Sequence, residues 1–194
     1  MRSEKFFMRV NLSVEEADEG DGASPAPIEI ELLNILNNKA KLEQVLAQEI
    51  LNLEIKELQG YDEIDISLSF KTPDEIREIN KNYRQIDEAT DVLSFPMFES
   101  NNNKLEIDAP LGMPLMLGDI IICLEKTFEM HSELGRQEAL LLMLAHSLLH
   151  LLGWDHDTEE RQNLMWARQD EIKAHLLNEL NRARQEDLQP SDGL

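Results

Sequence analysis

The sequence lacks the features of disulfide-rich, membrane-spanning or phosphate-loop proteins. Its one cysteine, Cys123, cannot form an internal disulfide, which fits a reducing compartment. The longest apolar stretch, residues 139–152, contains polar side chains and is short for a membrane span of ~20 residues. The first ten residues hold no apolar run of secretory length, so we expect a cytoplasmic protein with no membrane contact. There is also no glycine-rich loop that would cradle phosphates.

Basic side chains are scarce too. The chain has 18 Lys and Arg against 39 Asp and Glu, a formal net charge of −21. This balance argues against a broad basic surface that holds nucleic acid non-specifically, so an acidic ligand has to be met by a local site. The acidity is spread along the chain, although residues 15–27 predict a flexible acidic loop. With 42% hydrophobic residues, we expect one domain over residues 1–194, frayed after residue 185.

Hydrophobic periodicity predicts an α+β fold, a small mixed four-stranded sheet packed against helices. Apolar alternation, clearest between residues 62 and 70, predicts strands at 6–12, 62–70, 92–95 and 117–123. Apolar stripes at helical spacing predict helices at 32–58, 72–83, 124–134, 136–152 and from 157 or 158 onwards. Residues 97–116 show no clear period and predict a long loop.

The most informative segment runs from His146 to His156 and holds three of the five histidines. His146 and His150 are four residues apart on the predicted helix, so both rings project from one face and can bridge one metal ion. Gly153 ends this helix and tolerates the left-handed conformation, which allows His156 to return towards the same ion. Three imidazoles and a water would give one zincin-like zinc per chain with an open position, although such sites also accept nickel.

A structural interpretation of these histidines is also open. A lone histidine in an apolar helix is more often a hydrogen-bonded core residue than a metal ligand. Burying three imidazoles in a leucine-rich segment is costly unless each finds a partner, and one metal ion would satisfy all three, which favours the metal site. His131 and His175 have no such neighbours in the sequence, and we expect both at the surface.

The histidine spacing is also that of metzincin proteases, which makes a metallopeptidase an alternative. In those enzymes a glutamate directly follows the first histidine and acts as the general base. Here that position is Ser147, whose hydroxyl has no useful basicity at neutral pH. A peptidase would need another base, so we place proteolysis below a different hydrolysis.

The segment from His146 to His156 resembles the signature of the YbeY family, bacterial and organellar endoribonucleases that act in ribosomal RNA maturation. Residues 80–96 (NKNYRQIDEATDVLSFP) resemble a second signature of that family, and residues 117–120 (LGDI) resemble a third. The three segments stand in the family's order, and the resemblance is strong over residues 62–157. Three positions depart from the family pattern without losing a ligand or a charge: Ala89, Ser147 and Trp154, where proline, glycine and tyrosine are usual.

The resemblance implies a single-domain metal hydrolase in which His146, His150 and His156 hold zinc. It implies cleavage of single-stranded RNA and maturation of the 3′ end of 16S ribosomal RNA. The expected partners are ribosomal RNA and the small ribosomal subunit or its proteins. A ribosome-assembly factor with a purely structural metal is a further alternative, from a non-enzyme class.

Arg84 matches the functional arginine of the family. Its planar guanidinium donors suit phosphate oxygens, so the resemblance implies that it stabilises charge during cleavage. The alternative is an ordinary surface arginine, or an ion pair with Asp87 or Asp91. Because the chain is so acidic, we expect weak binding to free RNA and docking on a ribosomal subunit or protein partner.

Charged and aromatic residues beside these motifs suggest further roles. Asp155 and Asp157 could each orient a histidine or act as a base. We rank the orienting role first for Asp155 and, with Glu160 three residues on, a cap of the last helix first for Asp157. Tyr83 and Trp154 could stack on bases, although an aromatic side chain beside a motif is more often part of the core.

Overall fold

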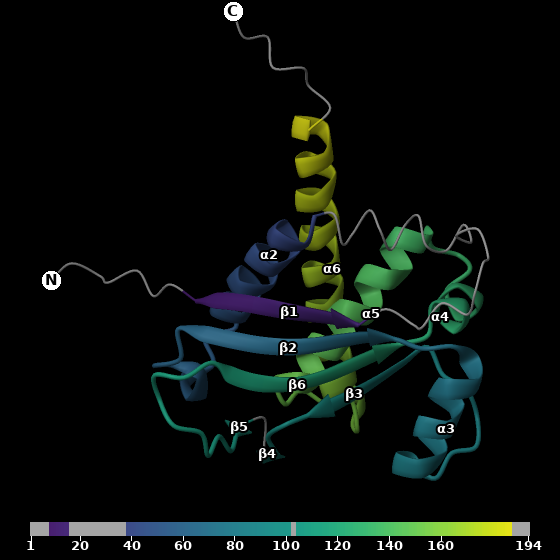
Figure 1. The fold of residues 1–194 in the computed structure, drawn as a ribbon, viewed down its shortest axis with the longest axis horizontal. Coiled ribbons are helices and arrows are strands. Elements are labelled where there is room, and N and C mark those ends of the chain that lie inside the picture. Colours follow the sequence, from purple (N-terminus) through teal and green to yellow (C-terminus); the bar gives the residue numbers. More distant parts are fainter. Residues whose placement is uncertain (1–7, 16–37, 102–103, 188–194) are drawn as a thin grey trace, which may run out of the picture.

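The computed structural model describes residues 8–15, 38–101 and 104–187, which form an α+β fold around a four-stranded sheet (Figure 1). Strands β1, β2 and β6 run parallel, and β3 is an edge strand antiparallel to β6. The predicted mixed sheet is therefore confirmed, with every strand within a few residues of its expected place. The strand order across the sheet is β1 (Arg9–Glu15), β2 (Glu63–Phe70), β6 (Leu115–Ile122) and β3 (Val92–Pro96).

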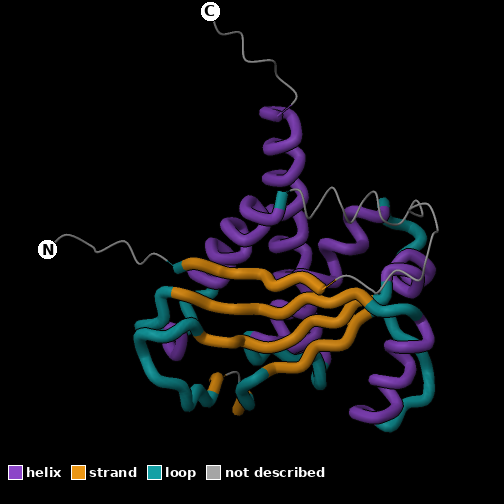
Figure 2. Tube along the Cα trace, viewed as in Figure 1, coloured by secondary structure: helices purple, strands orange, loops and turns teal. Residues whose placement is uncertain are grey.

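Helices cover one face of this sheet in two layers (Figure 2). Helix α5 contacts β3 and β6, α2 contacts β1, and α6 lies across both of these helices. Helices α3 and α4 lie at one end of the sheet (Figure 1). The helices are α2 (Lys39–Asn52), α3 (Pro73–Arg84), α4 (Leu124–Met130), α5 (Arg136–Leu151) and α6 (Glu159–Asp187).

Two predicted segments differ from the structure. The helix expected over 32–58 ends at Asn52 and is followed by a 3₁₀ turn, Lys56–Leu58, while residues 31–37 lie outside the described residues. The expected loop at 97–116 contains a short hairpin, β4 (Ser100–Asn101) with β5 (Lys104–Leu105), and the start of β6. Most of the expected acidic loop and the last seven residues are also outside the described part of the chain.

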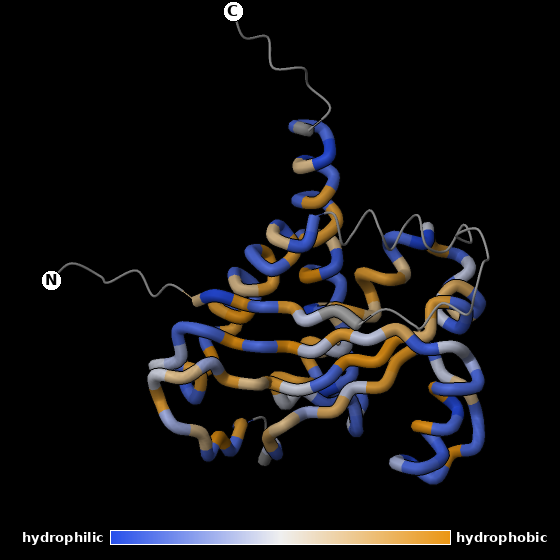
Figure 3. The backbone as a smooth tube through the Cα atoms, in the orientation of Figure 1, coloured by the Kyte–Doolittle hydropathy of each residue, from blue (hydrophilic) through white to orange (hydrophobic). Residues whose placement is uncertain are grey.

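The core lies between the sheet and α5. Residues 64, 66, 68 and 70 of β2 are all buried, as their alternation predicts. Most of α5 is buried as well, and Figure 3 shows its apolar colouring beside the apolar positions of the strands. Because this helix is enclosed by β3, β6, α4 and α6, the side chains it carries are held in fixed positions. Among the described residues, no helix is both long and apolar enough to cross a membrane.

Two helix starts show how local sequence sets the boundaries. Thr72 caps α3 through a reciprocal capping box with Glu75, and hydrogen bonds from Thr72 lower the pKa of that carboxyl group. At α6, the expected cap at Asp157 is wrong: Thr158 Oγ1 accepts the backbone N–H of Arg161 at 3.3 Å. Asp157 instead accepts a hydrogen bond from Arg161 Nη1 at 2.7 Å, four residues further along the chain.

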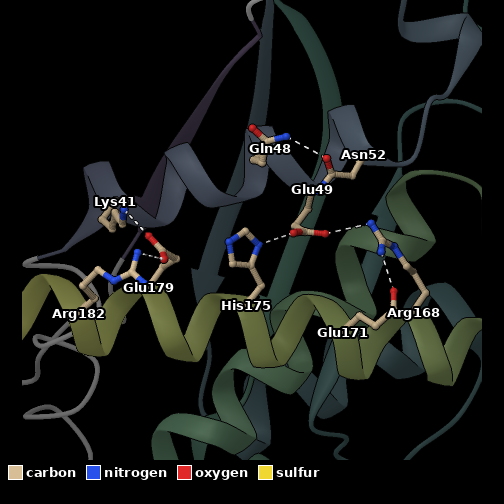
Figure 4. Close-up of polar contacts among 9 residues, drawn as sticks. All are labelled: Lys41, Gln48, Glu49, Asn52, Arg168, Glu171, His175, Glu179 and Arg182. Carbon is tan, nitrogen blue, oxygen red and sulfur yellow. Dashed lines mark hydrogen bonds and ion pairs between the residues drawn. The ribbon is translucent and has the colours of Figure 1, made fainter.

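A buried polar cluster joins α2 to α6, and we call it the Glu49 cluster (Glu49, Arg168 and His175; Figure 4). Glu49 is 4% exposed, yet its carboxylate accepts hydrogen bonds from His175 Nδ1 at 2.5 Å and Arg168 Nη2 at 3.0 Å. His175 reaches this carboxylate from the surface, where the sequence placed it, because its own side chain is 39% exposed. A carboxylate at this depth requires such partners, since an unpaired buried charge is costly.

Candidate metal centre

Three imidazoles converge where α5 ends. His146 and His150 lie one turn apart on α5, and their Nε2 atoms are 3.0 Å from each other. His156 follows on the next loop, and one ligand atom from each histidine lies within 4.8 Å of the other two. The structure thus brings together the three histidines that the sequence singled out.

Gly153 makes this convergence sterically feasible. Its φ of +83° is in the left-handed region, where side chains other than glycine are strained. A Cβ atom here would also lie 2.7 Å from Ser100 Oγ, which donates a hydrogen bond to the Gly153 carbonyl at 3.0 Å. Both the reversal of the chain and the packing of the β4–β5 hairpin therefore require glycine.

Hydrogen bonds fix which nitrogen of each helical imidazole is available. His150 Nδ1 donates to the backbone carbonyl of Trp154 at 3.0 Å, and His146 Nδ1 donates to Gln169 Oε1 of α6 at 2.8 Å. Burial lowers the pKa of His146 and lowers that of His150 to about 4, so both rings are neutral at pH 7. The Nε2 lone pairs of the two rings then point at each other.

This arrangement fits a metal ion. Two lone pairs at 3.0 Å repel each other unless a cation lies between them. In a tetrahedral zinc site, nitrogen ligands ~2.1 Å from the ion lie roughly 3.4 Å apart, close to the separation here. Imidazole nitrogens also suit zinc, nickel and copper better than hard cations. The residues present could therefore hold one transition-metal ion.

A cleft of about 980 Å³ opens beside these rings. It is lined by His150 and His156, by the edge strand β3 and by Arg84, the last residue of α3. Arg84 forms no hydrogen bond or ion pair with any described residue. The expected ion-pair partners are engaged elsewhere, because Asp87 pairs with Lys81 and Arg77 and the side chain of Asp91 pairs with His131. The ion-pair alternative for Arg84 is therefore wrong, whereas its exposure fits both a surface arginine and a guanidinium available to a ligand in the cleft.

Asp91 and His131 form another polar contact, between the start of β3 and the end of α4. His131 Nε2 lies 3.2 Å from Asp91 Oδ2, and its side chain is only 22% exposed, so its expected place at the surface is wrong. The other carboxylate oxygen of Asp91 accepts the backbone N–H of Val92 at the start of β3. This pair connects the end of α4 to the sheet.

Asp155 contacts the backbone of His156, whereas we expected it to orient a histidine ring. Its carboxylate accepts the backbone N–H of His156 at 2.8 Å and so shapes the loop rather than the ring. The groups that orient the rings are Gln169 and the Trp154 carbonyl, which the sequence analysis missed. A carbonyl leaves no sequence signal, and Gln169 lies 23 residues from its partner on another helix.

Ser147 has no part in the cluster. It is fully buried, and its hydroxyl has no hydrogen-bond partner among the described residues. In the described part of the chain, no aspartate or glutamate joins the three histidines. The position that holds the glutamate base in a metzincin is therefore taken by a buried serine.

A mixed sheet backed by a buried helix, with two histidines one turn apart and a third after a glycine reversal, defines a metal-dependent hydrolase of the three-histidine class. A family model described as Endoribonuclease YbeY matches residues 31–177. The chain belongs to this family and is an enzyme of the hydrolase class, which confirms the resemblance seen in three sequence segments.

Curated relatives named Endoribonuclease YbeY are similar over most of the chain. One from Thermoanaerobacter sp. (strain X514) is 38% identical over 157 residues, covering 74% of this chain and 98% of the relative. One from Listeria monocytogenes serotype 4b (strain CLIP80459) is 39% identical over 150 residues, covering 75% and 93%. One from Clostridioides difficile (strain 630) is 33% identical over 159 residues, covering 79% and 98%.

A solved structure supports the fold independently. The solution structure of TM1509 from Thermotoga maritima aligns with a TM-score of 0.51 at 23% identity. The alignment covers 93% of this chain and all of that chain. At this identity the likeness speaks for the shared fold alone.

Proposed function

We propose that this protein is a single-strand-specific, metal-dependent endoribonuclease that acts in 16S ribosomal RNA 3′-end processing and ribosome maturation. The facing Nε2 atoms of His146 and His150, beside an arginine with no partner among the described residues, are the observation that carries this proposal. The family and its endoribonuclease relatives support an RNA substrate. The three histidines would hold one zinc ion per chain.

The residues of the cleft divide the chemistry between them. Zinc lowers the pKa of a bound water towards ~7 and polarises phosphoryl oxygens. Gln169 and the Trp154 carbonyl keep protons on the Nδ1 atoms, so that both Nε2 lone pairs would be available to the ion. Arg84 lines the same cleft and donates to the non-bridging oxygens of the scissile phosphate, where negative charge develops.

The net charge of −21 shapes how this enzyme meets its substrate. The local positive charge of Arg84 and a metal ion can hold one phosphate, whereas the acidic surface repels the rest of a long RNA. We therefore expect affinity to come from docking on the small ribosomal subunit or its proteins in the cytoplasm. Tight, salt-insensitive binding to random RNA would contradict this expectation.

The direct test combines RNA cleavage with metal analysis. We expect purified protein to contain one zinc ion, or a similar transition-metal ion, per chain. We also expect it to cut a single-stranded oligonucleotide with the sequence of the 16S 3′ end. His146→Ala should lose the ion and the cleavage, whereas Arg84→Ala should keep the ion and lose about 10²-fold or more in kcat. Arg84→Lys, which keeps the charge but not the planar fork, should recover only part of the rate.

Cells without the protein should accumulate unprocessed 16S 3′ ends, and His146→Ala should not rescue them. Rescue by this folded but cleavage-dead variant would favour the assembly-factor alternative. Peptide cleavage that depends on His150, without RNA cleavage, would favour a peptidase.

A further inference from the structure

The two tyrosines of the chain have different environments. Tyr61 is buried, and its hydroxyl donates to the Ala109 carbonyl at 2.6 Å, so it contributes to the fold. Tyr83 is 74% exposed, and its hydroxyl has no hydrogen-bond partner among the described residues. A ring that is exposed to this extent contributes little to core packing and is free to contact a ligand.

Tyr83 directly precedes Arg84 in the last turn of α3. Successive residues of a helix point about 100° apart, and Arg84 lines the cleft whereas Tyr83 is not among its lining residues. The ring contacts Phe95, with centroids 5.1 Å apart and planes at 66°. Phe95 belongs to the edge strand β3 between Ser94 and Pro96, which both line the cleft. Tyr83 and Arg84 thus lie on either side of one exposed strand edge.

The contact with Phe95 holds the tyrosine ring without covering it. Phe95 packs against a small core cluster of Ile76, Leu93 and Cys123, which makes it a firm support. An edge-to-face contact leaves an aromatic face free, in keeping with the high exposure of Tyr83. A pre-positioned and solvent-exposed aromatic face is what an unpaired nucleobase stacks on.

We propose that Tyr83 stacks on an unpaired base of the RNA while Arg84 holds the adjoining phosphate in the cleft. This inference rests on the proposed ribonuclease function and names the feature by which the site selects single strands. A base in a duplex is already stacked and paired, so it cannot reach over the strand edge to the ring. Stacking tolerates any base and depends little on salt, which suits a chain with little positive charge.

The test compares cleavage kinetics of Tyr83→Ala, Tyr83→Phe and Trp166→Ala on a single-stranded oligonucleotide. Trp166 is a matched control, because it is 48% exposed on α6 and does not line the cleft. We expect Tyr83→Ala to raise KM about 10-fold with kcat within about twofold, because stacking contributes to binding. Tyr83→Phe should restore the wild-type KM, and Trp166→Ala should not change it.

A fluorescent base provides a second readout. In an RNA with 2-aminopurine at successive positions, one position should be quenched by the wild type and by Tyr83→Phe, but not by Tyr83→Ala. An unchanged KM in Tyr83→Ala, or the same rise in Trp166→Ala, would overturn the proposal. Loss of ribosomal-subunit binding with unchanged kinetics on free RNA would also overturn it and would identify the ring as a protein contact. If the wild type itself cuts no RNA, it is the proposed function that fails.

Discussion

The metal centre and the Glu49 cluster are both built from histidines and polar partners on buried helices, but they differ in how they are completed. In the Glu49 cluster, the carboxylate meets both His175 and Arg168, so its charge is compensated inside the protein (Figure 4). In the metal centre, His146 and His150 have partners at Nδ1 only, and their Nε2 atoms face each other. The paired carboxylate of Glu49 stabilises the fold, whereas the facing Nε2 atoms are suited to bind an ion from outside.

Glu49→Ala should have the largest effect, which should be on stability and not on metal content. Removing the carboxylate leaves the buried end of Arg168 without its partner, so the free energy of unfolding should fall by about 3 kcal/mol. Metal content should stay unchanged, because the Glu49 cluster contains no ligand of the metal centre. Urea denaturation and metal analysis measure the two quantities.

Glu171→Ala is the matched control for this prediction. Glu171 pairs with the same arginine from an exposed position, so its loss should change the stability by no more than about 0.5 kcal/mol. A Glu49→Ala protein that loses its metal would show that the two regions are not independent.

Gln169→Leu should have a somewhat smaller effect, on metal affinity rather than on stability. This change removes the group that holds the proton on His146 Nδ1 and keeps a side chain of similar size. Metal affinity should fall about 10- to 100-fold, while the stability of the metal-free protein should change little. Competition with a chromogenic chelator gives the affinity. Gln169→Glu should retain or raise it, and equal losses in both variants would contradict an orienting role.

The smallest effect concerns pH and the metal-free protein. Burial lowers the pKa of His150 to about 4, against about 6.5 in an unfolded chain. Between these values the unfolded chain binds a proton that the folded protein does not, so stability decreases as pH falls from 6.5 towards 4. We expect His150 to account for about 1 kcal/mol between pH 7.5 and 5.0, after allowance for its partly exposed ring.

Urea midpoints at the two pH values, for wild type and His150→Asn without metal, measure this contribution. The variant should show the weaker pH dependence. Equal slopes in the two proteins would mean that His150 is not held neutral by burial.

Local pattern explains which parts of the molecule could be predicted. The leucine-rich run around His146 and His150 determined both the buried helix and the site, because the spacing of the ligands lies within one element. Thr72 and Pro73 marked the start of α3 for the same reason. These features depend on neighbours within a few residues, and the structure confirms them.

Most of what the sequence did not predict involves contacts between distant elements. His175 pairs with a residue 126 positions away, and His131 pairs with one 40 positions away, so neither partner is visible in a local window. Gln169 was missed because which face of α6 meets α5 depends on tertiary packing. Asp157 failed as a cap because the adjacent Thr158 supplies the same acceptor with a shorter side chain.

Arg168 and Gln169 are successive residues of α6, and each serves a different cluster. Their side chains point about 100° apart, so the two contacts together define the rotation of the helix about its own axis. Turning α6 to improve one contact would break the other. A one-residue insertion or deletion between Thr158 and Arg168 would therefore shift the phase of the whole helix and misplace both the support of His146 and the partner of Glu49.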